Sequence, residues 1–333
     1  MLINFFEIEE WEKPSLQSAF AGHILSFFSE PLTTKNTSLY KNTEILSTFI
    51  YSQLTQEILS ALPNLKLITT RSTGFNHIDI EYCQKRGIVV CHVPTYGVNT
   101  IAEHTFALIL TLSRKIYPSI ERTRKGDFSL DGLRGFALAG KNLGIIGLGN
   151  IGKRVTEIAV SLKMQIFVYT RHPDLEFGKK YHLTYVDLPT LLKNSDIISV
   201  HVPLTAETKH LINKENVKLF KKGAILINTS RGAVVETEAI VLALESGILS
   251  GAGLDVLEEE RFLKEERELL TKEFLKTCDL KTQLLNHVLL TKENVIITPH
   301  NAFNSQEALQ EILNTTIANI KAYWENKPVN RVI

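Results

Sequence analysis

Cysteine is scarce in this sequence: positions 83, 91 and 278 hold the three thiols of a 333-residue chain. No two of them are spaced as a C-x-x-C pair, and an odd, low count argues against a disulfide framework. A reducing compartment such as the cytoplasm fits this count. We therefore expect Cys83, Cys91 and Cys278 to be buried, inert thiols rather than catalytic ones.

Long hydrophobic runs are also absent. A helix that spans a bilayer needs about 18 consecutive apolar residues, whereas the longest apolar region, residues 106–112, lies within a helical pattern and is far shorter. The first ten residues, MLINFFEIEE, lack a basic start followed by an apolar stretch, so they predict a buried strand and no secretory signal. We expect no association with a membrane.

Neither sign of charge dominates, because 37 basic and 36 acidic side chains leave a formal net charge of +1. Proteins that bind nucleic acids usually carry a clustered basic excess, so we expect no such partner. No group of side chains has the spacing of a zinc site, and we expect no metal. The length of 333 residues, with 44% apolar residues, predicts a globular protein of two domains.

The first hundred residues alternate between strand-like and helix-like segments. Short apolar strands separated by helices predict a parallel sheet that is covered on both faces. The expected strands are residues 2–8, 45–50, 67–70 and 88–91, and the expected helices are residues 16–28, 54–62 and 78–86.

A long helical pattern at residues 100–125, which Pro118 is expected to interrupt, leads into a second alternating series. Six strands with crossover helices predict a doubly wound dinucleotide-binding domain. The charged segment 261–292 breaks this rhythm and is expected to be a helical insertion, and the last helix should return to the first domain. The expected strands are 143–146, 166–169, 197–200, 225–228, 253–256 and 295–297, and the helices 151–164, 236–246 and 306–324.

A G-x-G-x-x-G motif follows the first strand of this second series and opens a helix. Gly147 permits the tight turn, Gly149 lets a pyrophosphate approach the backbone, and Gly152 lets the helix pack against the strand. The free N–H groups at the start of the helix would then face the phosphates, beside Asn150 and Ile151. A glycine-rich turn without a ligand is the alternative interpretation.

The next strand ends in Thr170 and Arg171, which bear on the choice between NAD and NADP. NAD enzymes usually place a carboxylate at this position to accept hydrogen bonds from the ribose. An arginine attracts a 2′-phosphate instead, so the sequence favours NADP or the use of both coenzymes. Alternatively, Arg171 stacks on the adenine or faces water.

Three further segments end predicted strands, and the carboxyl ends of parallel strands meet at one edge of a sheet. They contain Arg231, Glu260 and His300. A histidine can exchange a proton near neutral pH, a carboxylate can orient its ring, and an arginine can bind a substrate carboxylate and polarise the adjacent carbonyl. Glu258 and Glu259 flank Glu260, and a shift of one residue would move the carboxylate's role.

With these motifs in place, the chain resembles the D-2-hydroxyacid dehydrogenase family over essentially its whole length. The order and spacing of several segments carry this resemblance. They are residues 71–79 (RSTGFNHID), 93–96 (VPTY), 102–105 (AEHT), 147–152 (GLGNIG), 201–205 (HVPLT), 228–232 (NTSRG) and 298–300 (TPH).

The resemblance implies an α/β fold of two doubly wound parallel-sheet domains with a cleft between them. Residues 1–98 and 300–333 would form a flavodoxin-like substrate domain, and residues 99–299 a Rossmann cofactor domain. It also suggests a homodimer built around the helix that starts near Thr100.

The resemblance further implies roles for individual residues. Arg231 would bind the substrate carboxylate and carbonyl, Glu260 would be the partner carboxylate, and His300 the acid and base. Backbone groups near Thr73 and Gly74 would hold the substrate carboxylate. Asp255 would face the nicotinamide carboxamide, and the other residues expected along the cofactor are His201, Val202, Pro203, Thr208, Thr229 and Ser230.

Within the family, the D-lactate dehydrogenase branch is the most similar, and Tyr96 matches a tyrosine on the substrate side there, although it could also be a packed loop aromatic. Two features depart from that branch: Thr170 replaces an acidic residue, and residues 301–304 lack an aromatic pair. Pyruvate is the favoured substrate, and glyoxylate, hydroxypyruvate or a longer 2-oxo acid are alternatives. A dinucleotide-sensing, corepressor-like binding protein is a further alternative, which the intact Arg231, Glu260 and His300 set disfavours.

Overall fold

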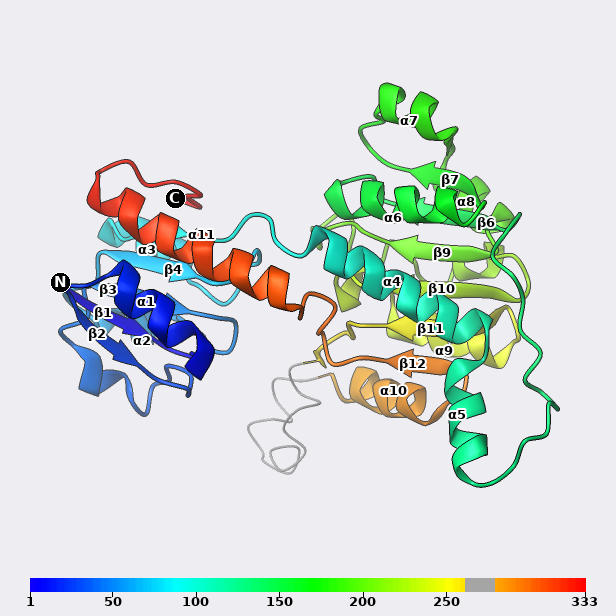
Figure 1. Cartoon of the computed structure of the whole chain (residues 1–333), viewed down its shortest axis with the longest axis horizontal. Coiled ribbons are helices and arrows are strands. Elements are labelled where there is room, and N and C mark those ends of the chain that lie inside the picture. The colour runs from blue at the N-terminus through cyan, green and yellow to red at the C-terminus, as the bar shows by residue number, and fades with distance from the viewer. Residues whose placement is uncertain (261–278) are drawn as a thin grey trace. The chain divides into compact units, whose positions relative to one another are not determined.

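A computed structural model of the chain describes residues 1–260 and 279–333 (Figure 1). The chain divides into two compact units, residues 1–97 with 304–333 and residues 98–303. The sequence places the return to the first unit at residue 300, whereas the structure places it at Asn304. His300 consequently belongs to the larger unit, where its backbone N–H donates to the carbonyl of Asp255 at 2.8 Å.

The smaller unit contains a five-stranded parallel sheet with the order β2-β1-β3-β4-β5, which is the flavodoxin-like order. Its strands are β1 (Leu2–Phe5), β2 (Ile24–Phe27), β3 (Ile45–Thr48), β4 (Leu67–Thr70) and β5 (Val89–Cys91). Its helices are η1 (Glu10–Glu12), α1 (Lys13–Ala19), η2 (Thr37–Tyr40), α2 (Gln56–Ser60), α3 (Ile80–Arg86) and α11 (Gln306–Trp324).

Successive strand residues of this unit alternate between two cores, because side chains of a strand point to opposite faces of the sheet. Ile45 packs with α1 and α11 on one face, and Leu46 packs with α2 and α3 on the other. The C-terminal residues extend the same unit, since Arg331 pairs with Cys91 in an antiparallel bridge. The expected return of the last helix to the first domain is therefore confirmed.

Cys83 and Cys91 are buried in these two cores, as expected. Burial raises the pKa of both thiols to about 11, which keeps them protonated and unreactive near neutral pH. Cys278 and most of the segment expected as an insertion lie outside the described residues.

The expected helix over residues 16–28 is wrong. Helix α1 ends at Ala19, Gly22 turns the chain at a φ of +92°, and residues 24–27 form the edge strand β2. Ile24 is exposed on this edge, so the strand lacks the alternation of a half-buried strand.

The larger unit contains a seven-stranded parallel sheet with the order β12-β11-β10-β9-β6-β7-β8, which extends the Rossmann order by one strand. Its strands are β6 (Asn142–Ile146), β7 (Gln165–Tyr169), β8 (Thr184–Tyr185), β9 (Ile197–Val200), β10 (Ala224–Asn228), β11 (Leu249–Leu254) and β12 (Val295–Ile297). Its helices are α4 (Val98–Ser113), α5 (Ile116–Arg124), α6 (Asn150–Ser161), α7 (Leu175–Tyr181), α8 (Leu188–Asn194), η3 (Val217–Leu219), η4 (Gly232–Val234), α9 (Thr237–Glu245) and α10 (Leu280–Thr291).

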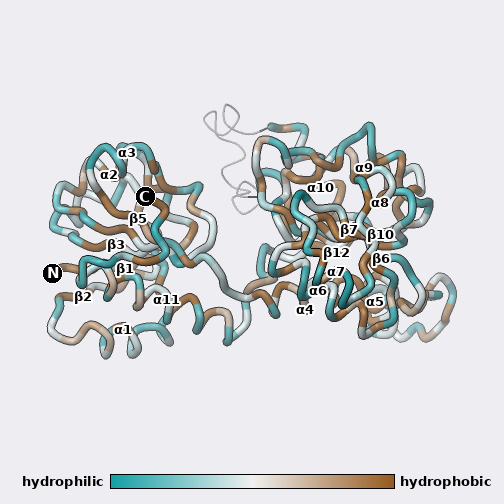
Figure 2. Tube along the Cα trace, turned by 90° about the horizontal axis from the view of Figure 1, so that it is seen from above, coloured by the Kyte–Doolittle hydropathy of each residue, from teal (hydrophilic) through white to brown (hydrophobic). Residues whose placement is uncertain are grey.

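Helices cover both faces of this sheet (Figure 1). α4 and α6 pack on one face, against side chains such as Ile145 and Ile227. α8, α9 and α10 pack on the other face, against Ile146 and Leu226. The strands are correspondingly hydrophobic in Figure 2, and the predicted α/β fold of two doubly wound sheets is confirmed.

Two expectations for this unit are corrected. The long helix is interrupted at Lys115, which adopts the left-handed conformation, whereas Pro118 lies in the first turn of α5, where a proline costs no helical hydrogen bond. β11 begins at Leu249 rather than at residue 253, because Gly251 and Gly253 belong to the strand. A Cβ at Gly253 would lie 3.0 Å from Leu108 Cβ of α4, so the glycine lets the helix pack closely.

Among the described residues, no helix combines the length and the apolar character that crossing a membrane demands.

Candidate active site

The candidate site of the larger unit lies where the strands β6, β9, β10, β11 and β12 end. All of these strands are parallel, so the segments that follow them leave from the same edge of the sheet. The strand order reverses between β6 and β9, and ligands of open α/β sheets bind at such a switch point.

The glycine turn after β6 has the three features that its motif predicts. Gly147 adopts a φ of +97°, and a Cβ there would lie 2.6 Å from the carbonyl oxygen of His201. A Cβ at Gly152 would lie 2.1 Å from the carbonyl oxygen of Gly147, so the helix and the turn are in close contact. Around Gly149, by contrast, no atom other than those of the residue itself and its chain neighbours lies within 4 Å of the place that a Cβ would take.

This open space at Gly149 adjoins the start of α6. Gly149 is the N-cap of the 12-residue helix and provides no side-chain cap, and Gly149 and Asn150 are both exposed. The first N–H groups of a helix without a side-chain cap are directed at whatever lies before the helix, and the helix dipole favours an anion there. The turn therefore fits the pyrophosphate of a dinucleotide.

Residues 201–208, which follow β9, border this turn. His201 Nε2 lies 2.8 Å from Ser199 Oγ, and burial lowers the pKa of His201 to about 4, so its ring is neutral near pH 7. Thr208 is buried, and its hydroxyl donates to the carbonyl of Pro203 at 2.5 Å. Val202 contacts the turn directly, because a Cβ at Gly147 would lie 2.7 Å from its Cγ1.

The end of β7 carries Thr170 and Arg171, as expected, and places a third residue beside them. Arg171 Nη2 lies 3.5 Å from Glu207 Oε2, and the two side chains are 59% and 67% exposed. A hydrogen bond from Thr205 and the nearby guanidinium of Arg171 lower the pKa of Glu207, so it is ionised near neutral pH. A 2′-phosphate that approached Arg171 would thus meet a carboxylate.

The turn after β10 presents Arg231. Asn228 closes this turn, since its Nδ2 donates to the Arg231 carbonyl at 3.0 Å and its Oδ1 accepts from the Ser230 N–H at 3.1 Å. Thr229 is buried, with its hydroxyl 3.1 Å from the hydroxyl of Thr105 on α4. The Arg231 side chain is exposed, and its Nη1 donates to the Ser230 carbonyl at 2.7 Å.

His300 and Glu260 are in direct contact. His300 Nδ1 lies 2.5 Å from Glu260 Oε1, and the second carboxylate oxygen accepts from the Leu257 N–H at 3.2 Å. Both side chains are about one-third exposed, at 29% and 34%. The ring is thus oriented through Nδ1, which leaves Nε2 as the nitrogen that can exchange a proton with a substrate.

A buried carboxylate supports the loop that bears His300. Asp255 is 1% exposed, and its oxygens accept from the N–H groups of Asn301 and Ala302, both at 3.0 Å. The hydroxyl of Thr298 donates to Asp255 Oδ1 at 2.5 Å and lies 3.0 Å from His104 Nε2. These bonds hold His300 in a left-handed conformation with a φ of +52°.

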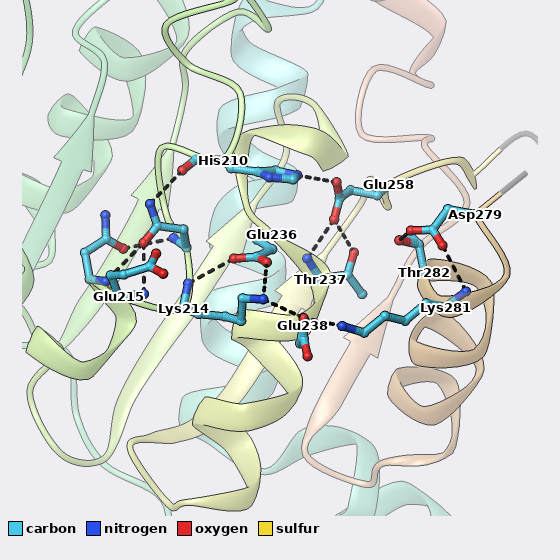
Figure 3. A network of polar contacts seen from close by, with 12 residues as sticks. His210, Lys214, Glu215, Glu236, Thr237, Glu238, Glu258, Asp279, Lys281 and Thr282 are labelled. Carbon is cyan, nitrogen blue, oxygen red and sulfur yellow. Dashed lines mark hydrogen bonds and ion pairs between the residues drawn. The ribbon is translucent and has the colours of Figure 1, made fainter.

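The two other glutamates of the acidic run have different partners. Glu258 is bonded to His210 and to Thr237 at the start of α9 (Figure 3). Glu259 Oε2 accepts from the Asp279 N–H at 3.0 Å. Of these three carboxylates, Glu260 is therefore the one that contacts the His300 ring.

The smaller unit holds the residues expected to contact the substrate. Thr73 is exposed, and its hydroxyl donates to the Val93 carbonyl at 2.9 Å. The Gly74 carbonyl accepts from Ser72 Oγ at 2.6 Å, so the turn after β4 is well supported. Tyr96 is half-buried, two residues before α4 begins.

Sequence reasoning missed three residues that organise the larger site: Asn228, His210 and Glu207. Asn228 lies within a motif, but its side-chain bonds depend on the turn geometry. His210 and Glu207 find partners 48 and 36 positions away, at Glu258 and Arg171, and no local pattern reports such contacts.

Comparison with known proteins agrees with this arrangement. Residues 106–302 match the family described as D-isomer specific 2-hydroxyacid dehydrogenase, NAD binding domain. D-lactate dehydrogenase of Escherichia coli K12 is 34% identical over 327 residues, which cover 96% of each chain. Glyoxylate reductase of Thermococcus litoralis is 35% identical over 340 residues, with 100% of this chain and 92% of the relative covered.

A solved structure extends the similarity to the fold. D-lactate dehydrogenase from Aquifex aeolicus, in complex with NAD and lactic acid, superposes with a TM-score of 0.85 at 38% identity. The match covers 98% of this chain and 96% of the other, so both units have counterparts in that structure.

Proposed function

This chain belongs to the D-isomer specific 2-hydroxyacid dehydrogenases, and from that premise we propose that it reduces pyruvate to D-lactate. It is an NAD-dependent oxidoreductase that acts on CH–OH groups, so the alternative of a binding protein without an activity is set aside. The observation that carries the proposal is the contact between His300 and Glu260 beside the strand end that presents Arg231. The names of the Escherichia coli and Aquifex aeolicus relatives support the substrate.

The reaction needs a hydride and a proton, which reach the substrate from different sources. A nicotinamide held in the dinucleotide site would supply the hydride for the second carbon of the 2-oxo acid. His300 donates the proton from Nε2 to the carbonyl oxygen, and it accepts that proton in the oxidation direction. Glu260 fixes the orientation of the ring through Nδ1.

Arg231 binds the substrate and polarises it. Its guanidinium is exposed at the end of β10, on the turn that Asn228 and Gly232 hold against the segment that carries Glu260. Paired N–H donors match a carboxylate and also stabilise the charge that develops on the adjacent oxygen. On the smaller unit, we assign the turn at Thr73 and Gly74 to the substrate carboxylate, and Tyr96 to the substrate side chain.

For the coenzyme, we propose that the chain uses NADH and accepts NADPH less well. The glycine turn, the neutral His201, Thr208 and the segment from Thr229 to Ser230 line the dinucleotide, and Asp255 faces the carboxamide. Thr170 lacks the charge that would repel a 2′-phosphate, and Arg171 supplies an attraction. Glu207 opposes that attraction, because its carboxylate lies 3.5 Å from the same guanidinium.

We also propose a homodimer in the cytoplasm. Exposed apolar side chains gather on the end of α4, on α5 and on the loop that follows, where a second copy of the chain would cover them. They are Leu110, Ile116, Tyr117, Ile120, Phe128 and Leu130. Light scattering coupled to gel filtration tests this proposal, and a monomer at micromolar concentration would contradict it.

The activity is tested with purified protein, NADH and a panel of 2-oxo acids. We expect pyruvate to give the highest kcat/KM, with D-lactate as the product in a stereospecific assay. A preference for glyoxylate or hydroxypyruvate would retain the family chemistry and favour the function named for the Thermococcus litoralis relative. Absence of turnover with every 2-oxo acid would overturn the proposed function.

A further inference from the structure

A second histidine–glutamate pair, His210 and Glu258, involves the same acidic run that contains Glu260. His210 Nε2 is 2.7 Å from Glu258 Oε1, and the Glu258 side chain is 12% exposed (Figure 3). Its other oxygen accepts two bonds from Thr237, at 2.7 Å from the backbone N–H and at 2.7 Å from the hydroxyl. A carboxylate that is mostly buried and bonded to three donors is held in one position.

The backbone of His210 joins this pair to the turn that bears Arg231. The His210 N–H donates to the Ala233 carbonyl at 2.8 Å, two residues after Arg231. The next residues continue the contact, since Ile212 and Val235 form a parallel bridge. His210 therefore contacts both catalytic segments. Its main chain bonds to the turn that bears Arg231, and its ring bonds to Glu258, two residues before Glu260.

The backbone of Glu258 lies against the same turn. A Cβ at Gly232 would be 2.0 Å from the carbonyl carbon of Leu257 and 2.4 Å from the Glu258 nitrogen, so the two segments touch. From the other side, Asn286 of α10 donates to the Glu258 carbonyl at 2.9 Å. Glu260 follows two residues later, and its position depends on where Glu258 is fixed.

We propose that His210 and Glu258 are positioning residues. They fix the position of the Arg231 turn relative to the segment that carries Glu260. This inference rests on the proposed function. Neither residue acts on the substrate; they act through Arg231, Glu260 and His300. A displacement of about 1 Å in a reacting group can lower the rate about 100-fold. Loss of either positioning residue should therefore lower kcat more than it weakens the binding of NADH.

The same region offers a matched control. Glu238, also in the first turn of α9, accepts from Lys214 at 2.9 Å and from Lys281 at 2.6 Å (Figure 3). Its side chain is 25% exposed, and within the described part of the chain its partners are these two lysines, which lie outside the Arg231 turn and the segment from 257 to 260. Glu238→Gln therefore removes one carboxylate charge from the first turn of α9 and leaves the bonds of Glu258 to His210 and Thr237 in place.

The experiment compares Glu258→Gln, His210→Ala, His210→Gln and Glu238→Gln in the full chain. For each variant, kcat, the KM for pyruvate, the Kd for NADH and the melting temperature are measured. We expect Glu258→Gln and His210→Ala to lower kcat by about 10- to 100-fold, with the Kd for NADH within about twofold of wild type. His210→Gln keeps an N–H donor for Glu258 and should recover part of kcat, whereas Glu238→Gln should lower the melting temperature alone.

Hydrogen exchange provides a readout that does not depend on the substrate. Peptides that cover residues 231–237 and 254–260 should exchange faster in Glu258→Gln than in wild type or Glu238→Gln. If wild type turns over no 2-oxo acid, the proposed function fails. The positioning role is then judged from hydrogen exchange and not from kcat. Unchanged exchange in those peptides, or a kcat within twofold of wild type in Glu258→Gln, would overturn the inference.

Discussion

His300 Nδ1 lies 2.5 Å from Glu260 Oε1, and the two residues come from segments that follow different strands of the sheet. The contact directs one ring nitrogen to the carboxylate and leaves the other for proton exchange. It also selects Glu260 from a run of three glutamates, because Glu258 and Glu259 bond to His210 and to the Asp279 N–H.

Replacing the proton donor should abolish most of the turnover and leave the coenzyme bound. We expect His300→Ala to lower kcat by about 100- to 10,000-fold, the range typical for loss of a general acid. The Kd for NADH, measured by its fluorescence, should stay close to that of wild type. A variant with full activity would contradict the assignment of His300.

Glu260→Gln tests the orienting carboxylate, with Glu259→Gln as its control. Glutamine can still accept a hydrogen bond but carries no charge, so we expect kcat for Glu260→Gln to fall by about 10- to 100-fold. Glu259→Gln changes a carboxylate that contacts Asp279 instead, and its kcat should remain near wild type. Equal losses in both variants would argue against the assigned register.

Two glycines of the turn after β6 should respond to alanine in opposite ways. The Cβ of Gly152→Ala would meet the Gly147 carbonyl oxygen at 2.1 Å, so this variant should lose stability. The Cβ of Gly149→Ala meets no protein atom within 4 Å beyond its own chain neighbours, so the melting temperature of this variant should stay the same. Its Kd for NADH should rise at least about tenfold, because the added methyl group occupies the approach of the pyrophosphate. Unchanged NADH affinity in Gly149→Ala would contradict the proposed binding mode.

Coenzyme choice should depend on the pair of Arg171 and Glu207. The pair is exposed, so its energy is small, and we expect Glu207→Gln to raise kcat/KM for NADPH by about two- to fivefold. Arg171→Gln should lower kcat/KM for NADPH and leave that for NADH nearly unchanged. If Glu207→Gln raised the values for NADH and NADPH equally, the carboxylate would have no part in the selection.

The sequence predicts well the parts of this site that depend on local pattern. The turn from Gly147 to Gly152 is such a case, because each glycine has a local steric reason. The order of the parallel strands also brings Arg231, Glu260 and His300 to one edge of the sheet without any knowledge of side-chain contacts.

Other parts depend on contacts between distant segments and could not be predicted. The strand at Ile24 lies on an edge and lacks an alternating pattern, and the break at Lys115 is a backbone conformation with no glycine to mark it. The start of β11 is hard to predict because Gly251 weakens the strand signal, although a Cβ there would lie 2.8 Å from the carbonyl oxygen of Asn294. His210 belongs to the same class, since its partner Glu258 is 48 positions away.

The neutral state of His201 predicts how the larger unit responds to acid. Burial lowers the pKa of His201 to about 4, whereas an unfolded histidine titrates near 6.5. Above pH 6.5 the ring is neutral in both states, so it contributes no pH dependence. Between pH 6.5 and about 4 the unfolded chain binds a proton that the folded chain does not, and stability falls by up to about 1.4 kcal/mol per pH unit.

His201→Gln removes this titration and keeps a polar group near Ser199. We therefore expect the difference in free energy of unfolding between wild type and variant to be constant above pH 7 and to shift in favour of the variant as the pH falls to 5. Denaturant titrations at several pH values measure it, with His182→Gln as a control for an exposed histidine. Parallel curves for wild type and His201→Gln over that range would mean that His201 accepts a proton in the folded protein, and its ring would then be charged in mild acid.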